Sequence, residues 1–87
     1  MGFLNRLDFI ILLILKKSGA ARSLSSMTVR EIACTEDLGV KENTIFKKIK
    51  NLERSGYIER GLKEGRADTY FITPKGCKRL EEEGSRS

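Results

Sequence analysis

The segment that decides the fold spans residues 38–60, LGVKENTIFKKIKNLERSGYIER. Its centre predicts a helix over about residues 41–55, because three apolar residues recur at spacings of four and three and so share one helical face. Gly39 supplies the tight turn before this helix, since glycine alone adopts positive φ without penalty. The helical period of the apolar residues ends after this helix, and residues 57–60 predict a strand. The inward stripe of the predicted helix is Ile45, Ile49 and Leu52.

Two further helices are expected on the N-terminal side of this segment. Residues 4–17 form an apolar run that ends in two lysines before a glycine, the pattern of a helix C-terminus. Residues 28–37 open with Thr-x-x-Glu, a capping box in which the two side chains bind the exposed amides of the first turn. A polar, serine-rich connector over residues 18–27 joins the two helices.

The C-terminal side predicts a β-hairpin and a last helix. Strands at either end of residues 57–73 enclose a loop with two glycines and several ionisable residues. Thr73 and Pro74 then begin a helix over about residues 74–83, because threonine caps and proline suits the first helical position. With 87 residues, the chain has room for one core, so we expect a single domain over residues 1–87.

This order of elements is typical of a winged helix-turn-helix, an α+β fold of mostly helix with a three-helix core and a two-stranded wing. The residues also resemble MarR- and PadR-type transcriptional regulators over about residues 28–80. The resemblance rests on Leu38-Gly39-Val40, Gly56-Tyr57-Ile58, Gly65-Arg66-Ala67 and Ile72-Thr73-Pro74-Lys75-Gly76. In those families an arginine seven residues before the Thr-x-x-Gly motif marks the wing tip, and Arg66 keeps that separation from Thr73.

The chain departs from the family pattern in three ways. Phe46 occupies a slot that usually holds a small polar residue. Gly39 lies six positions after Ala33, where a spacing of four positions is usual, so the second helix is longer or its turn looser. The long helices that follow the wing in MarR proteins have no counterpart after Leu80. The resemblance therefore implies neither an effector pocket of that type nor a small-molecule substrate or cofactor.

The outward face of the 41–55 helix predicts a surface that reads DNA, because a major groove admits one helix. Asn43 is expected to pair with adenine, Lys47 to reach guanine and Thr44 to touch a thymine methyl group. Phe46 is expected either to contact thymine methyls or to fold back over the helix-turn-helix. Lys48 and Lys50 are expected to bind phosphates.

Two residues of the wing extend this predicted surface. By the family resemblance, Arg66 enters the minor groove, where a basic side chain senses groove width. The alternative for Arg66 is an ion pair with Asp68 or Glu64. Lys63 is expected to bind the DNA backbone.

Charge supports a polyanionic partner. The chain carries +5 at neutral pH, but residues 41–79 hold eleven basic and five acidic side chains, a net +6, and the remainder is near neutral. The chain has no histidine, which removes the commonest general base and metal ligand, so we expect neither an enzyme nor a metal site. Cys34 and Cys77 are expected to be small apolar residues, with a redox-sensing pair as the alternative.

The first helix carries apolar residues on two faces. Phe9, Leu12 and Leu13 fall away from the main stripe, so we expect them to form a homodimer contact; the alternative is a helix at the centre of the fold. Its apolar run is too short to span a bilayer and has the wrong flanking charges for a secretory signal. We therefore expect a cytoplasmic, nucleoid-associated protein without a membrane partner.

The function predicted from these features is sequence-specific regulation of transcription by a homodimer on double-stranded DNA. The alternative is a winged-helix module that mediates protein interaction or assembly without reading DNA, because fold alone does not settle function. The basic third helix favours the DNA-binding interpretation.

Overall fold

The computed structural model describes residues 6–63 and 65–84. Four α-helices, one short 3-10 helix and three strands follow one another along the chain. In order, they are α1 (Arg6–Lys17), η1 (Ser23–Ser25), β1 (Met27–Thr28), α2 (Val29–Thr35), α3 (Glu42–Arg54), β2 (Ile58–Arg60), β3 (Thr69–Ile72) and α4 (Pro74–Gly84).

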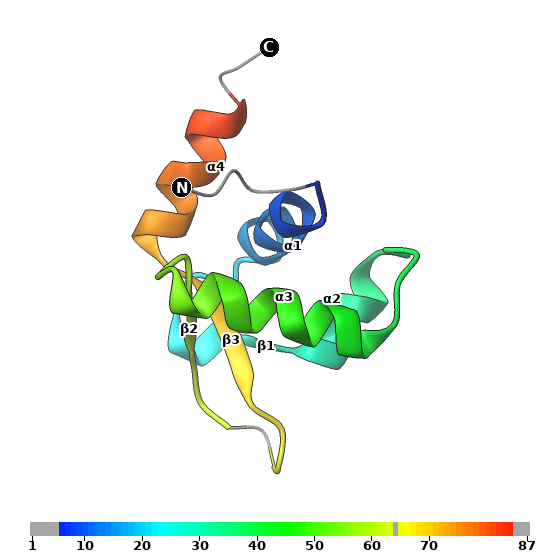
Figure 1. Cartoon of the computed structure of the whole chain (residues 1–87). Coiled ribbons are helices and arrows are strands. Elements are labelled where there is room, and N and C mark those ends of the chain that lie inside the picture. The colour runs from blue at the N-terminus through cyan, green and yellow to red at the C-terminus, as the bar shows by residue number, and fades with distance from the viewer. Residues whose placement is uncertain (1–5, 64, 85–87) are drawn as a thin grey trace.

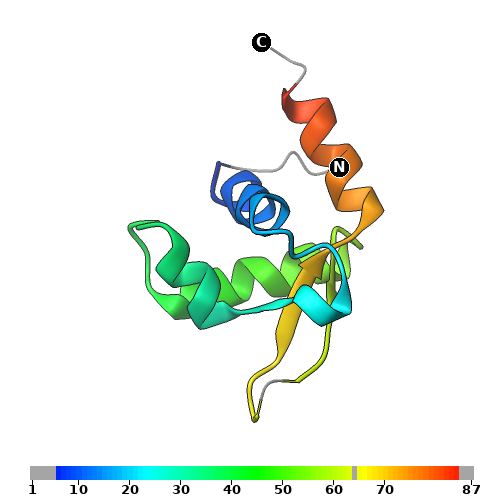
Figure 2. The same cartoon turned by 180° about the vertical axis from the view of Figure 1, so that it is seen from behind.

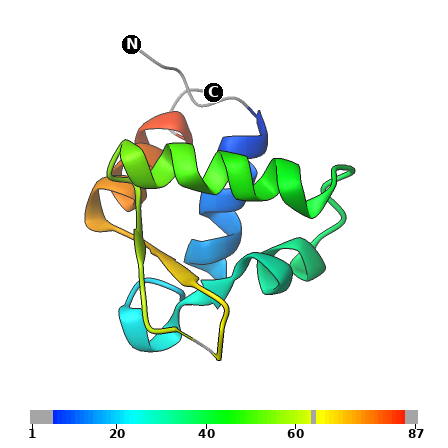
Figure 3. The same ribbon diagram turned by 60° about the horizontal axis from the view of Figure 1, so that its bottom comes forward.

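Helices α1, α2 and α3 surround the core, and the small sheet lies beside them (Figures 1 and 2). The loop between β2 and β3 projects away from the helices on the side opposite α4, and it forms the wing. Figure 3 shows α3 lying across the molecule, with α2 and the wing on the same side of it. This arrangement confirms the predicted α+β winged helix-turn-helix.

The sheet has one strand more than predicted. Its order is β1-β3-β2, and both neighbours of β3 run antiparallel to it. Met27 pairs with Tyr70 on one side, and Ile58 pairs with Ile72 on the other. The amide of Ile72 also donates to the carbonyl of Ala20 at 2.8 Å, which ties the connector after α1 to the centre of the sheet. The edge strand β1 therefore begins at Met27, the last residue of the predicted polar connector, and ends at Thr28.

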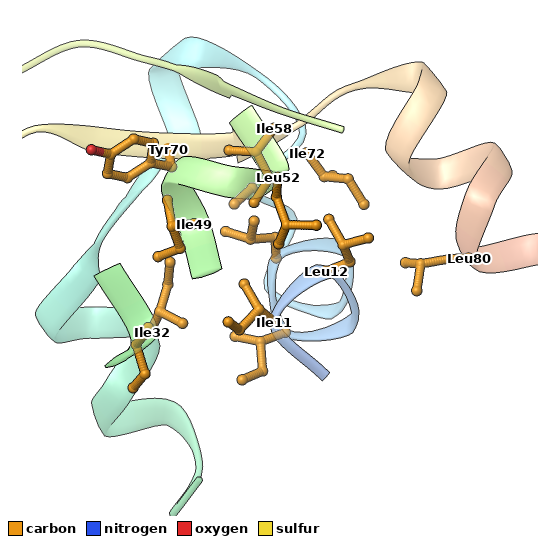
Figure 4. Packing of buried hydrophobic residues seen from close by; sticks show 13 residues of the cluster. Ile11, Leu12, Ile32, Ile49, Leu52, Ile58, Tyr70, Ile72 and Leu80 are labelled. Carbon is orange, nitrogen blue, oxygen red and sulfur yellow. The ribbon is translucent and has the colours of Figure 1, made fainter. Parts of the chain in front are cut away.

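The core is aliphatic, with a single aromatic ring at its edge (Figure 4). Helix α1 packs against α2, α3, α4 and β3, so it lies at the centre of the fold. Leu12 is fully buried inside the chain and belongs to this core. The prediction that Leu12 faces a second chain was wrong, because Leu12 is buried within the chain together with Ile11, Ile14 and Leu15 of the same helix.

Helix α2 begins as predicted and ends earlier than predicted. Thr28 Oγ1 accepts from the amide of Glu31 at 3.1 Å, and the Glu31 carboxylate accepts from the amide of Thr28 at 2.9 Å, so the capping box is complete. The helix stops at Thr35 because Asp37 accepts from the amide of Gly39, whose φ is +71°. This side-chain turn takes up the two extra residues between Ala33 and Gly39.

The end of α3 is fastened to the start of α4. Lys75 Nζ donates to the carbonyl of Ser55 at 2.8 Å and lies 5.3 Å from the centre of the Tyr57 ring. Thr73 Oγ1 donates to the carbonyl of Gly56 at 2.6 Å and caps α4 by accepting from the amide of Gly76. A cation at a helix C-terminus satisfies carbonyls that the helix leaves unpaired. These contacts set where α3 ends and where the wing begins.

Candidate DNA-binding surface

Helix α3 has one buried face and one exposed face, and the exposed face is the one predicted to read DNA. Ile45, Ile49 and Leu52 are buried against the core, as expected. Asn43 and Lys47 lie on the opposite face and are exposed. A helix oriented in this way presents amide and ammonium donors to solvent along its first two turns, where base edges are read in a major groove.

The flanks of α3 carry the other predicted contacts. Thr44 and Lys48 on one flank and Lys50 on the other are half-buried. The N-cap residue of α3 is Lys41, and its side chain makes no capping hydrogen bond. The amides of the first turn therefore receive no side-chain acceptor from the cap. Such amides and a nearby ammonium group favour a phosphate oxygen.

Phe46 lies on the flank of α3 that faces the wing, and 43% of its surface is exposed. Lys50 Nζ lies 5.5 Å from the centre of the Phe46 ring, within cation–π range. Phe46 shares its surroundings with the start of α2 and with Tyr70 of β3. The ring thus partly covers the helix-turn-helix, and its remaining surface is available to a ligand.

A charged bridge that sequence reasoning missed connects α3 to the wing. Glu53 lies 3.5 Å from Lys50 Nζ and 3.8 Å from Arg60 Nε, so one carboxylate holds a cation of α3 and a cation of β2. Surface ion pairs of this kind contribute little stability. They do orient side chains, and here they hold Lys50 and Arg60 at the same carboxylate. Arg60 lies at an exposed position of β2. Considering the charged residues of the predicted strands would have identified it.

The wing tip holds the other two predicted residues. Lys63 and Arg66 are exposed, and Gly65 beside Arg66 has φ of +64° in the turn. Arg66 makes no ion pair with Asp68, and Glu64, the other predicted partner, lies outside the described residues. Within the described chain, the guanidinium group of Arg66 is therefore presented to solvent. Thr69, at the base of the wing, donates to the carbonyl of Leu62 and accepts from Ser26 Oγ at 2.7 Å.

The remaining predicted residues lie away from this surface. Phe9 and Leu13 are half-buried and lie on the side of α1 opposite its four buried residues. Cys34 is exposed, Cys77 is half-buried, and both are free thiols. Residues 6–63 and 65–84 contain no group of three or more acidic or cysteine side chains placed to hold a metal ion. No helix among them is long and apolar enough to cross a membrane.

The comparisons with known proteins agree with this geometry. The chain matches no model of a protein family. It is 29% identical to the DNA-binding protein TubR of Clostridium botulinum C phage over 77 residues, which are 88% of this chain and 93% of that protein. The structure of TubR from Bacillus megaterium pBM400 superposes with a TM-score of 0.78 at 19% identity, over 91% of this chain and 84% of TubR.

A MarR-family transcriptional regulator from Rhodococcus sp. RHA1 superposes with a TM-score of 0.77 at 20% identity. The chain has the fold of both groups. The match covers 95% of this chain and 54% of the Rhodococcus protein, so this chain spans about half the length of that regulator. By their names, the phage protein is a DNA-binding protein and the Rhodococcus protein is a transcriptional regulator.

Proposed function

We propose that this chain is a sequence-specific double-stranded DNA-binding protein that regulates transcription as a homodimer. The observation that carries the proposal is the exposed outward face of α3, with Asn43 and Lys47 on a helix whose opposite face is buried. The 29% identical relative, itself named as a DNA-binding protein, supports it over most of the chain. The net charge of +6 over residues 41–79 supplies the attraction to phosphate.

In this proposal α3 enters a major groove and the wing tip reaches the adjacent backbone or minor groove. Asn43, Thr44 and Lys47 contact base edges, whereas Lys48 and Lys63 bind phosphates. Lys50 and Arg60 form a pair of cations held together by Glu53, and a phosphate group between α3 and the wing would meet both. Arg66 at the tip senses the width of the minor groove.

The homodimer rests on the outward side of α1. Phe9 and Leu13 are apolar residues on the side of this helix opposite its buried stripe. Covering them with a second copy removes apolar surface from water. A symmetric pair of chains would present two α3 helices to half-sites about 34 Å apart, one helical turn of DNA.

The direct test selects a preferred duplex from a random-sequence library and measures its affinity by fluorescence anisotropy at about 150 mM salt. We expect the selected duplex to bind about a thousandfold more tightly than a scrambled duplex of the same composition. Equal affinity for both duplexes would contradict sequence-specific binding and would favour the interaction-module alternative.

Variants separate base reading from phosphate binding. Asn43→Ala and Lys47→Ala should each lose about 1–3 kcal/mol of discrimination against a changed base pair. Lys48→Ala should weaken the selected and scrambled duplexes alike and reduce the salt slope by about one. Lys17→Ala, an exposed lysine on α1, is the matched control and should change neither quantity.

A further inference from the structure

A hollow of about 530 Å³ lies between α2, α3 and the wing, beside the proposed DNA-binding residues. Its walls come from the first turn of α2, the first two turns of α3 and the strand that returns from the wing tip. Figure 3 shows these three elements on the same side of the molecule. The hollow is mostly apolar, and the exposed ring of Phe46 forms part of its wall.

Two of the described residues that line this hollow, Tyr70 and Asp68, each carry a buried polar atom without a hydrogen-bond partner. Tyr70 is fully buried, and its hydroxyl group has no hydrogen-bond partner among residues 6–63 and 65–84. Figure 4 shows this hydroxyl group pointing away from the aliphatic core. One carboxylate oxygen of Asp68 is also buried and has no partner in the same part of the chain. Proteins rarely leave such groups unpaired, and exceptions need an explanation.

The charges around the hollow have the opposite sign to the chain as a whole. Glu31, Glu42 and Asp68 line it, against a single cation, Arg30. Glu31 is occupied by the capping box of α2. The remaining carboxylates repel a phosphate group and accept hydrogen bonds from N–H donors. An aromatic wall beside carboxylates favours a planar cation, which gains contact with the ring and an ion pair with the acid.

We propose that this hollow binds a small planar aromatic cation. Its N–H groups donate to the Asp68 carboxylate and to the oxygen of the Tyr70 hydroxyl group, and its ring packs against Phe46. The ligand would lie between α3 and the wing, the two elements proposed to contact DNA. The binding itself does not depend on the proposed function.

The probe for this site is benzamidine, a flat aromatic amidinium ion, and its control is benzoate, which has the same shape and the opposite charge. Both are titrated into the 15N-labelled full chain, without DNA, and amide chemical shifts are followed by NMR. We expect benzamidine to shift amides of residues 28–31, 42–46 and 67–70 with a Kd of about 1 mM or tighter. Benzoate should bind at least about tenfold more weakly, because the lining carboxylates repel it. Equal binding of the two, or shifts confined to other residues, would overturn the proposal.

Conservative variants test these two buried polar groups. Tyr70→Phe and Asp68→Asn should each weaken benzamidine about tenfold, the loss expected for one hydrogen bond. Tyr57→Phe is the matched control, because Tyr57, the chain's other tyrosine, lies beneath Lys75 and outside the hollow. This variant should bind benzamidine as tightly as the natural protein does. Unchanged affinity in either Tyr70→Phe or Asp68→Asn overturns the site. If the chain bound its selected duplex but did not bind benzamidine, the ligand site would be contradicted and the proposed function would stand.

Discussion

Among the residues that the structure describes, Tyr70 is the largest fully buried side chain and the single aromatic member of the buried core. Its ring belongs to the same hydrophobic cluster as Ile49 and Ile58, but its hydroxyl group finds no partner in the described chain. A buried hydroxyl group without a hydrogen bond costs a folded protein about 1–3 kcal/mol. The molecule carries this cost at one edge of its core, where the proposed ligand site begins.

Replacing Tyr70 by phenylalanine should therefore stabilise the free protein. Tyr70→Phe keeps the ring and removes the unpaired hydroxyl group, so the free energy of unfolding should rise by about 1 kcal/mol. Urea denaturation followed by circular dichroism measures this change. Tyr57→Phe, at a half-buried tyrosine, is the control and should stay within about 0.5 kcal/mol. A clear loss of stability in Tyr70→Phe would show that the hydroxyl group is paired in solution.

The same residue should make stability depend on alkaline pH. Burial raises the pKa of the Tyr70 hydroxyl group above its usual value; Asp68 and Glu53 add to the rise, and Arg60 opposes it. The folded state thus holds this proton more tightly than the unfolded state does. Its contribution to stability is complete below the unfolded pKa of about 10 and is lost as pH rises from there through the folded pKa. Unfolding free energies measured between about pH 9 and 11 should fall less steeply in Tyr70→Phe than in the natural protein.

Other single residues show where sequence reasoning succeeds and where it stops. Spacing alone placed Asn43 and Lys47 on the exposed face of α3, because a helix of known period has only one side opposite its buried stripe. It could not place Leu12, because a helical pattern shows that a face is apolar but does not show which element covers it. The sequence also could not predict that the hydroxyl group of Tyr70 is unpaired, because its pairing depends on the tertiary contacts around the ring.

Among the elements, the four α-helices and the two strands of the wing were predicted, and β1 and η1 were not. The α3 helix lies one residue inside its predicted limits at each end. Strand β1 has two residues and η1 has three, so neither is long enough to show a period. Strand β1 exists because residues of β3 pair with it, and this tertiary contact leaves no local signal in the serine-rich segment around it.

The junction between α4 and the wing supplies the sharpest test at this scale. Replacing a glycine inside a helix by alanine usually raises the free energy of unfolding by about 1 kcal/mol. Gly76 should behave in the opposite way, because a methyl group there would overlap the backbone oxygen of Tyr57 and come within 2.7 Å of Ile72 Cγ1. We expect Gly76→Ala to lower the free energy of unfolding by about 1–3 kcal/mol in thermal or urea denaturation.

The control for this variant is Lys78→Ala, at an exposed position on the same helix. It should change stability by no more than about 0.5 kcal/mol. If Gly76→Ala were as stable as Lys78→Ala, the close approach of α4 to the start of β2 would not exist in solution.

At the scale of the whole molecule, the proposed dimer can be tested by measuring the oligomeric state of the chain and of a variant of α1. Leu13→Glu puts a charge at a half-buried position of α1 that packs against the edge of the core but lies outside its fully buried stripe, so the fold should persist with reduced stability while the second copy is repelled. Sedimentation velocity should give a dimer for the natural chain and a monomer for this variant. Lys16→Ala, an exposed change on the same helix, should remain dimeric. A natural chain that sediments as a monomer at high concentration would remove the dimer from the proposal.

The order of strands has a consequence for how the chain matures during synthesis. The strand in the middle of the sheet, β3, is the last of the three to be made, and its partner β1 precedes it by about forty residues. A ribosome therefore releases all the residues of α1, α2 and α3 before any strand can find its neighbour. Until residues 69–72 emerge, the nascent chain exposes the edges of β1 and β2 and has no wing. An amber stop codon placed just before Thr69 would yield the residues of the first three helices without the strand that closes the sheet.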